Sequence, residues 1–268
     1  MLKGKLPIIT GVCLGLGWPI LNSLASESLS LLIGDTFRPV IPLLILLVFF
    51  EVGLKLLFWP VLAPITHISI APQRVNPERW KPFAHEQLAQ YTAELEQLGF
   101  TLLTDYTFTT SAQSQPSPAT ARLFVHPQKF VFAEIAQTEN LPVSCSVSTF
   151  LESGWEMAVT NIAATNTLNA VSHAFMRQPR TLIRRRRGQS TGDLLQSLLS
   201  WRDQVCVDLS VEVLEEVDAD AYFRKDANRR NRSRSRLLRS SMTWRLMEVV
   251  WFSLRPKQEW LGEYSPVV

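Results

Sequence analysis

Few residues in this chain have the type and spacing that catalysis or metal binding requires. The four histidines stand far apart, and none lies beside a cysteine or a pair of aspartates. No HExxH, CxxC or EF-hand spacing occurs, and no GxSxG, Walker-type or GxGxxG loop follows a predicted strand. The acidic residues between 215 and 220 begin a predicted helix, where carboxylates complement the helix dipole. We therefore predict no catalytic residue, no metal site and no cofactor.

One pair of charges stands out because it lies inside an apolar run. Glu51 and Lys55 are four residues apart and share one helix face, with the glutamate in the favourable N-terminal position. A lone charge at the bilayer centre costs about 2.5–3.5 kcal/mol on insertion scales, so such residues are usually paired. We favour a self-neutralising pair. The alternatives are a proton- or ion-sensitive element and a docking point for another membrane protein.

The strongest concentration of charge lies near the C-terminus. Residues 171–268 hold 18 Lys and Arg against 12 Asp and Glu, a net charge of +6. Eight of these cations fall within 16 residues: Arg224, Lys225, Arg229, Arg230, Arg232, Arg234, Arg236 and Arg239. A second run, Arg184, Arg185, Arg186 and Arg187, follows a predicted strand and would extend the same positive surface. Such a surface favours an acidic partner.

Residues 242–254 follow the basic stretch and form an amphipathic pattern. Apolar residues gather on one side of the predicted helix, with Trp244 and Trp251 near its border. A basic helix edged by tryptophan is typical of one that lies in a lipid headgroup layer, where each arginine adds about 1 kcal/mol. Three alternatives remain: the apolar side packs on the domain's sheet and leaves the arginines solvated, the helix binds another protein, or it binds nucleic acid. Nucleic acid is the least favoured partner, because aromatic residues do not interleave with the arginines.

Two apolar stretches, residues 6–25 and 40–62, are long enough to cross a bilayer as helices. Together they predict a transmembrane hairpin in residues 1–65. A cleaved signal peptide is the alternative for the first stretch, but a second span follows it closely. Gly11 and Gly15 are four residues apart in the first span, a spacing that lets a second helix approach closely.

The cations around these spans indicate their orientation. Lys3 and Lys5 precede the first span, and three cations follow the second, whereas the connecting loop is acidic. The positive-inside rule then predicts a two-pass integral membrane protein with both termini and the soluble domain in the cytoplasm.

The rest of the chain predicts a small α+β domain. Residues 66–82 contain three prolines and read as a linker, and residues 83–98 fit a helix that Gly99 ends. Short β-rich runs follow at 100–109, 121–126, 129–136, 143–150 and 155–160, and a further strand is expected at 181–186. Because most spacers are too short for crossover helices, we expect an antiparallel sheet with helices on one face. Helices are expected at about 191–207 and 218–254.

The expected domain division is therefore a hairpin at 1–65, a linker at 66–82, an α+β domain at 83–215, and a basic amphipathic helix and tail at 216–268. The order of turn motifs within it is distinctive: Leu98-Gly99-Phe100, Leu123-Phe124-Val125-His126-Pro127, Ser146-Val147-Ser148 and Thr160-Asn161. This order resembles a group of uncharacterised bacterial membrane proteins that pair an N-terminal membrane segment with a small α+β domain. The resemblance implies an architecture and no activity.

These observations favour a membrane-anchored accessory, scaffold or assembly protein whose cytoplasmic domain binds other molecules at the membrane surface. Its expected partners are the lipid bilayer, with anionic headgroups, and a membrane protein that contacts the second span. The competing classes are a membrane-associated enzyme whose site carries no sequence signature, and a nucleic-acid-binding membrane protein.

Overall fold

The computed structural model of the protein describes residues 46, 48–57, 71–74, 84–109, 119–138, 142–162 and 167–266. These residues belong to two compact units. The first comprises residues 1–65 with 240–246, and the second comprises residues 66–239 with 247–268. The described part of the first unit contains a helical segment at residues 46 and 48–57. The second unit contains the α+β domain, so this prediction is confirmed.

The domain is built on a sheet whose eight described strands are neighbours in the order in which they occur along the chain. The strands are β1 (Ala71–Arg74), β2 (Thr101–Thr109), β3 (Ala119–His126), β4 (Val131–Thr138), β5 (Ser144–Phe150), β6 (Glu156–Thr160), β7 (Thr181–Arg185) and β8 (Glu259–Trp260). All neighbouring pairs among them are antiparallel except β6 and β7, which run parallel.

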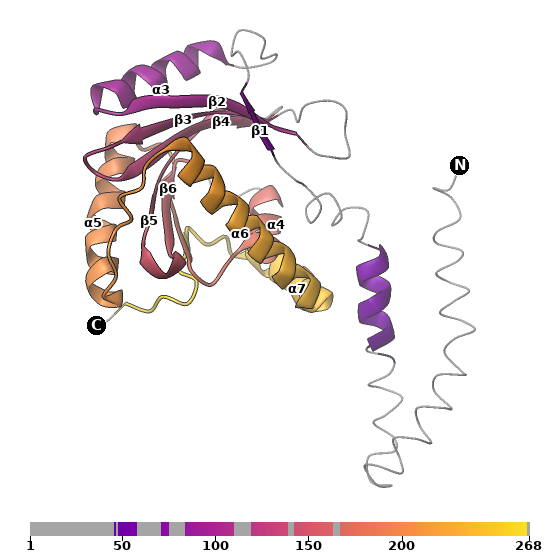
Figure 1. Cartoon of the computed structure of the whole chain (residues 1–268). Coiled ribbons are helices and arrows are strands. Elements are labelled where there is room, and N and C mark those ends of the chain that lie inside the picture. The colour runs from indigo at the N-terminus through magenta and orange to yellow at the C-terminus, as the bar shows by residue number, and fades with distance from the viewer. Residues whose placement is uncertain are drawn as a thin grey trace. The chain divides into compact units, whose positions relative to one another are not determined.

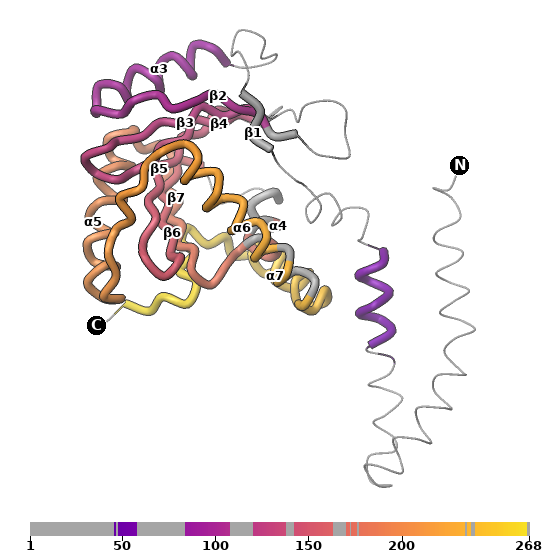
Figure 2. The backbone as a smooth tube through the Cα atoms, viewed as in Figure 1, coloured from indigo at the N-terminus to yellow at the C-terminus, as the bar shows by residue number. Residues whose placement is uncertain are grey.

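The expectation of a purely antiparallel sheet is therefore wrong at this one pair. The segment between β6 and β7 contains a helix, α4 (Thr167–Met176), and is long enough for a crossover between parallel strands. Figure 2 labels β6 and β7, which lie side by side in the sheet. The sequence signal for α4 is the spacing of Ala170 and Ala174 by one helical turn, and the structure shows both to be buried.

Helices cover both faces of the sheet, not one face as expected. The first face packs against α3 (His85–Gln97) and α5 (Thr191–Leu209), which supply Leu95, Leu198 and Trp201 to the main core. The second face packs against α6 (Ala219–Arg239), which contributes Tyr222 and Phe223 to a smaller cluster. In Figure 1, α5 and α6 lie on opposite sides of the strands. The domain therefore has three layers.

Local sequence explains where the helices of the first face begin and end. Ser190 and Asp193 form a capping box that satisfies backbone N–H groups at the start of α5. Gly99, at φ 88°, follows α3 in the left-handed conformation, and the Phe100 N–H then donates to the Leu95 carbonyl. These two caps confirm the predicted positions of both helices to within a few residues.

The single long helix expected at 218–254 is two helices, α6 and α7 (Met242–Leu254). The break falls at Ser240 and Ser241, and the Ser241 hydroxyl accepts a hydrogen bond from the Trp244 N–H at 3.3 Å. Serine favours this N-cap position because its side chain satisfies a backbone donor that has no partner within the helix. The basic and amphipathic parts of the C-terminal region are therefore separate elements.

The chain after α7 returns to the domain. Its short strand β8 pairs with β7, and the buried Tyr264 hydroxyl donates to Asp208 at 2.5 Å. Gly262 is required at the turn because its φ is 58° and an added Cβ would lie 1.9 Å from the Pro179 carbonyl oxygen. The tail thus completes the sheet edge next to β7.

Candidate functional site

Arg229 attaches the centre of α6 to the sheet. Its guanidinium donates to the Glu156 carboxylate at 2.7 Å and also pairs with Asp226 one helical turn earlier. Both acidic side chains are largely buried. Attraction to Glu156, and then to Asp226, raises the pKa of Arg229. This cation of the basic run is therefore paired with acidic residues of the domain itself.

Several neighbours of Arg229 also contact groups of the domain. The further contacts are Arg230 with Asp226, Arg224 with Glu216, Arg236 with the Arg177 carbonyl, and Lys225 with the face of the Phe150 ring. Arg232 and Arg239 are exposed. The side chain of Arg234 lies outside the described part of the chain. Only part of the predicted basic surface is thus available to a partner.

Two tyrosines share one carboxylate between α6 and the sheet. Tyr106 donates to Glu134 at 2.5 Å, and Tyr222 donates to the same oxygen at 2.7 Å. Burial, followed by the negative charge of Glu134, raises the pKa of both phenols well above the usual value of 10. They are therefore neutral donors at physiological pH, and the cluster is a structural network without a free nucleophile.

Helix α7 has one covered face and one open face. Its covered face includes Met242, Arg245 and Phe252, which are all nearly inaccessible to solvent. Its open face carries five large apolar side chains, each at least 58% exposed, and we call them the α7 stripe: Trp244, Met247, Val250, Trp251 and Leu254. Trp244 and Trp251, predicted near the border of the apolar side, thus belong to the exposed stripe.

Cations accompany the end of this stripe. The Arg255 guanidinium lies 5.3 Å from the centre of the Trp251 ring, and both Arg255 and Lys257 are exposed. Arg239 occurs shortly before α7 in the sequence and is exposed as well. An apolar stripe with flanking cations is suited to an anionic, amphiphilic surface.

The second basic run ends β7, and its members have different environments. Arg184 pairs with Glu259 at 3.0 Å, and Arg186 lies 3.8 Å from the same carboxylate. Arg187 is exposed. Arg185 is buried and stacks on the ring of Trp260. The four arginines therefore do not form one continuous positive surface.

Glu51 contacts more than the lysine predicted to neutralise it. Glu51 and Lys55 are 3.8 Å apart, but the carboxylate also accepts hydrogen bonds from the start of α7 within the first unit. The donors are the Ser241 hydroxyl at 3.0 Å, the Met242 N–H, and both the N–H and the hydroxyl of Thr243, at 3.1 and 2.9 Å. Glu51 therefore caps α7. No sequence signal joins these segments, because about 190 residues separate them.

The helical segment that carries Glu51 is apolar and open. Its exposed large side chains are Leu46, Val48, Phe50, Val52, Leu56 and Leu57. Among the residues that the structure describes, no helix is long and apolar enough to cross a membrane. The predicted span at 6–25, with Gly11 and Gly15, lies outside the described residues, as does part of the span at 40–62.

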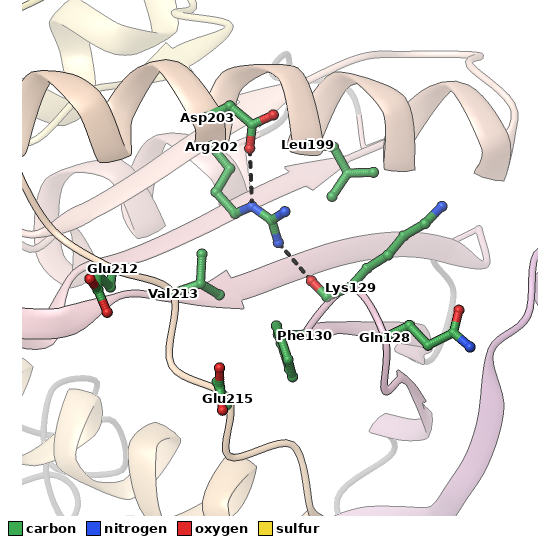
Figure 3. A pocket seen from close by; sticks show the side chains of 9 residues that line it. All are labelled: Gln128, Lys129, Phe130, Leu199, Arg202, Asp203, Glu212, Val213 and Glu215. Carbon is green, nitrogen blue, oxygen red and sulfur yellow. Dashed lines mark hydrogen bonds and ion pairs between the residues drawn. The ribbon is translucent and has the colours of Figure 1, made fainter.

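The domain also has a surface hollow of about 450 Å³ between the β3–β4 turn, the middle of α5 and the chain that follows α5 (Figure 3). Arg202 points into it and donates to the Lys129 carbonyl at 2.6 Å, with Asp203 at 3.6 Å. Carboxylates and cations both line this hollow, and the guanidinium already has partners in the protein. Within the described ranges, no three His, Cys, Asp or Glu side chains gather as a metal site would require.

No family model, curated protein or solved structure matches the chain. Its function must therefore be argued from the geometry of its own residues.

Proposed function

We propose that this chain is a membrane-anchored accessory protein whose α+β domain is held at the anionic, cytoplasmic face of a membrane, with α7 lying in the headgroup layer. The observation that carries this proposal is the α7 stripe. Fully burying one large apolar side chain contributes about 1.5–3 kcal/mol, so five exposed ones on one helix face represent a substantial unused driving force. Insertion of α7 into the boundary between acyl chains and headgroups would bury these side chains and gain that free energy.

Charge favours a membrane as the occupant of the stripe. Arg239, Arg255 and Lys257 flank α7 in the sequence and are exposed, and a cation near an anionic leaflet adds about 1 kcal/mol. Trp244 and Trp251 suit the interface because indole combines an apolar ring with a polar N–H. Two apolar segments long enough to span a bilayer precede the domain and would hold α7 close to this surface.

The polar groups of the domain favour a binding or scaffold role over an enzymatic one. The buried polar clusters on the α6 side join α6 to the sheet through paired contacts, such as Arg229 with Glu156 and Tyr222 with Glu134. Neither cluster contains a side chain activated for nucleophilic attack. In this proposal the two-pass anchor fixes the domain at the membrane, and the surface away from α7 is available to partners.

The test compares two cysteines placed on α7 of the full chain in proteoliposomes. Val250→Cys lies in the stripe, and Ser253→Cys is the matched control, because Ser253 is exposed but lies outside the stripe. Cys13 and Cys206 are replaced by serine. Cys145 can remain, since burial raises its pKa to about 12 and keeps its thiol unreactive.

A membrane-impermeant maleimide should label Ser253→Cys in all vesicles that expose the domain. It should label Val250→Cys several-fold more slowly in vesicles of anionic lipid than in vesicles of neutral lipid. Equal labelling of the two cysteines in anionic vesicles would show that α7 does not lie in the headgroup layer, and the proposal would fail.

A further inference from the structure

Two adjacent arginines at the end of β7 make the same aromatic contact on opposite faces of the sheet. The Arg184 guanidinium lies 4.0 Å from the centre of the Trp201 ring, and the Arg185 guanidinium lies 4.2 Å from the centre of the Trp260 ring. Successive residues of a strand point to opposite faces, so the two contacts are independent. The environments of the two arginines can therefore be compared directly.

The two arginines differ in their anionic partner. Arg184 has Glu259 at 3.0 Å, whereas no carboxylate among the described residues pairs with Arg185. Arg185 is nevertheless only 6% exposed, and its Nη1 is closed to solvent without a hydrogen-bond acceptor in the part of the chain that the structure describes. A buried arginine is rarely left without an anion, because its desolvation is then uncompensated.

The ring beneath Arg185 adds a second donor that lacks an acceptor. The Trp260 Nε1–H is also buried without a partner among the described residues. Trp260 is firmly placed, because β8 pairs with β7 and the Glu263 N–H donates to the Pro179 carbonyl at 2.7 Å just after it. Two buried donors, one on Arg185 and one on the ring that it contacts, therefore lack an acceptor among the described residues.

We propose that Arg185 and Trp260 bind a phosphate group. A planar guanidinium donates two parallel hydrogen bonds to an oxyanion, and the indole N–H can supply another. Phosphate is favoured over a carboxylate because its several acceptor oxygens can receive the guanidinium and the indole N–H at the same time. Burial lowers the pKa of Arg185 to about 10, so the guanidinium is still charged at neutral pH.

The phosphate could belong to a soluble molecule or to a lipid headgroup. The site is close to α7, because the His173 ring contacts both Trp260, at 5.4 Å between centroids, and Phe252 of α7, at 4.6 Å. The side chain of His173 therefore lies between Trp260 of the site and Phe252 of α7. It does not depend on the proposed membrane contact of the stripe, since a soluble phosphate would occupy it as well.

The experiment measures the thermal unfolding of the full chain in nanodiscs by tryptophan fluorescence. In neutral nanodiscs, inorganic phosphate is titrated against chloride at matched ionic strength. In a second arm, phosphate is omitted and the neutral lipid is replaced in part by phosphatidylglycerol. A bound ligand at about ten times its dissociation constant should raise Tm by about 3–6 °C. A shift in the first arm identifies a soluble source, and a shift in the second arm alone identifies a lipid.

Arg185→Met and Arg184→Met are the matched variants. Arg185→Met should lose the ligand-dependent shift and, without ligand, should be at least as stable as the native chain, because an uncompensated charge is gone. Arg184→Met should keep the shift but unfold at a lower temperature, since it leaves Glu259 without its closest cation. If neither ligand raises the Tm of the native chain, or if Arg185→Met responds as the native chain does, the phosphate site is wrong.

Discussion

Helices α6 and α7 follow one another in the chain, and their compositions suggest opposite roles. The eight cations between Arg224 and Arg239 lie in α6, whereas α7 is largely apolar. In the structure, α6 is fastened to the sheet by its charges, and α7 leaves an apolar face open. Composition alone therefore does not tell which helix contacts a partner.

The difference arises from the two faces of the sheet. The first face is apolar and is covered by α3 and α5. The second face carries Glu134 and Glu156 in half-buried positions, where a carboxylate needs a donor or a cation. The polar helix α6 supplies both through Tyr222 and Arg229. A charged helix is thus the better cover for this face.

The sharpest test of the comparison uses adjacent aromatic residues of α7. Phe252 is 2% exposed and Trp251 is 58% exposed. Phe252→Ala should lower the free energy of unfolding by about 3 kcal/mol, because it removes buried contacts and leaves a cavity. Trp251→Ala should change it by less than about 0.5 kcal/mol. Urea unfolding of the full chain in detergent measures both, and a large loss in Trp251→Ala would mean that the stripe is packed within the protein.

A second test asks whether the cations of α6 are structural. Arg229→Met should destabilise the domain by about 2–3 kcal/mol, less than for a fully buried pair because the Arg229 side chain is 38% exposed. The cause is the uncompensated charge of Glu156, because Asp226 still has Arg230 as a partner. Arg232→Met, in the same helix and exposed, should be neutral within about 0.5 kcal/mol. Equal losses in the two variants would contradict the distinction between paired and open arginines.

Much of the fold could be predicted because its signals are local. Alternation in the strands, the Ser190 capping box and Gly99 all lie within a few residues of the structure that they specify. The parallel β6–β7 pair, strand β8 and strand β1, which lies within the predicted linker at 66–82, were missed because each depends on a distant segment. Glu259 and Trp260 alone do not read as a strand, and they become one only beside β7.

The candidate sites were harder to predict for the same reason. The arginine runs were found from the sequence, but their roles depend on partners far along the chain: Arg229 meets Glu156 across 73 residues, and Arg185 meets Trp260 across a comparable distance. Before these contacts are known, each arginine in a run looks alike. Only the three-dimensional structure separates the paired cations from the exposed ones and from the buried Arg185.

The last test concerns the tyrosines that join α6 to the sheet. Burial raises the pKa of Tyr106 and Tyr222 well above 10, so in the folded protein they keep their protons at a pH where unfolded tyrosines ionise. The folded state then binds more protons, and stability should fall as the pH rises above about 10, by up to about 1.4 kcal/mol per pH unit for each tyrosine. Tyr91 and Tyr264 contribute in the same direction. Urea unfolding from about pH 8 to about pH 12 should therefore show a shallower loss in the Tyr106→Phe/Tyr222→Phe variant than in the native chain. The variant should also be less stable at the lower pH, because Glu134 loses both donors. An unchanged slope would mean that these phenols are open to solvent in the native protein and that α6 is not held against the sheet as described.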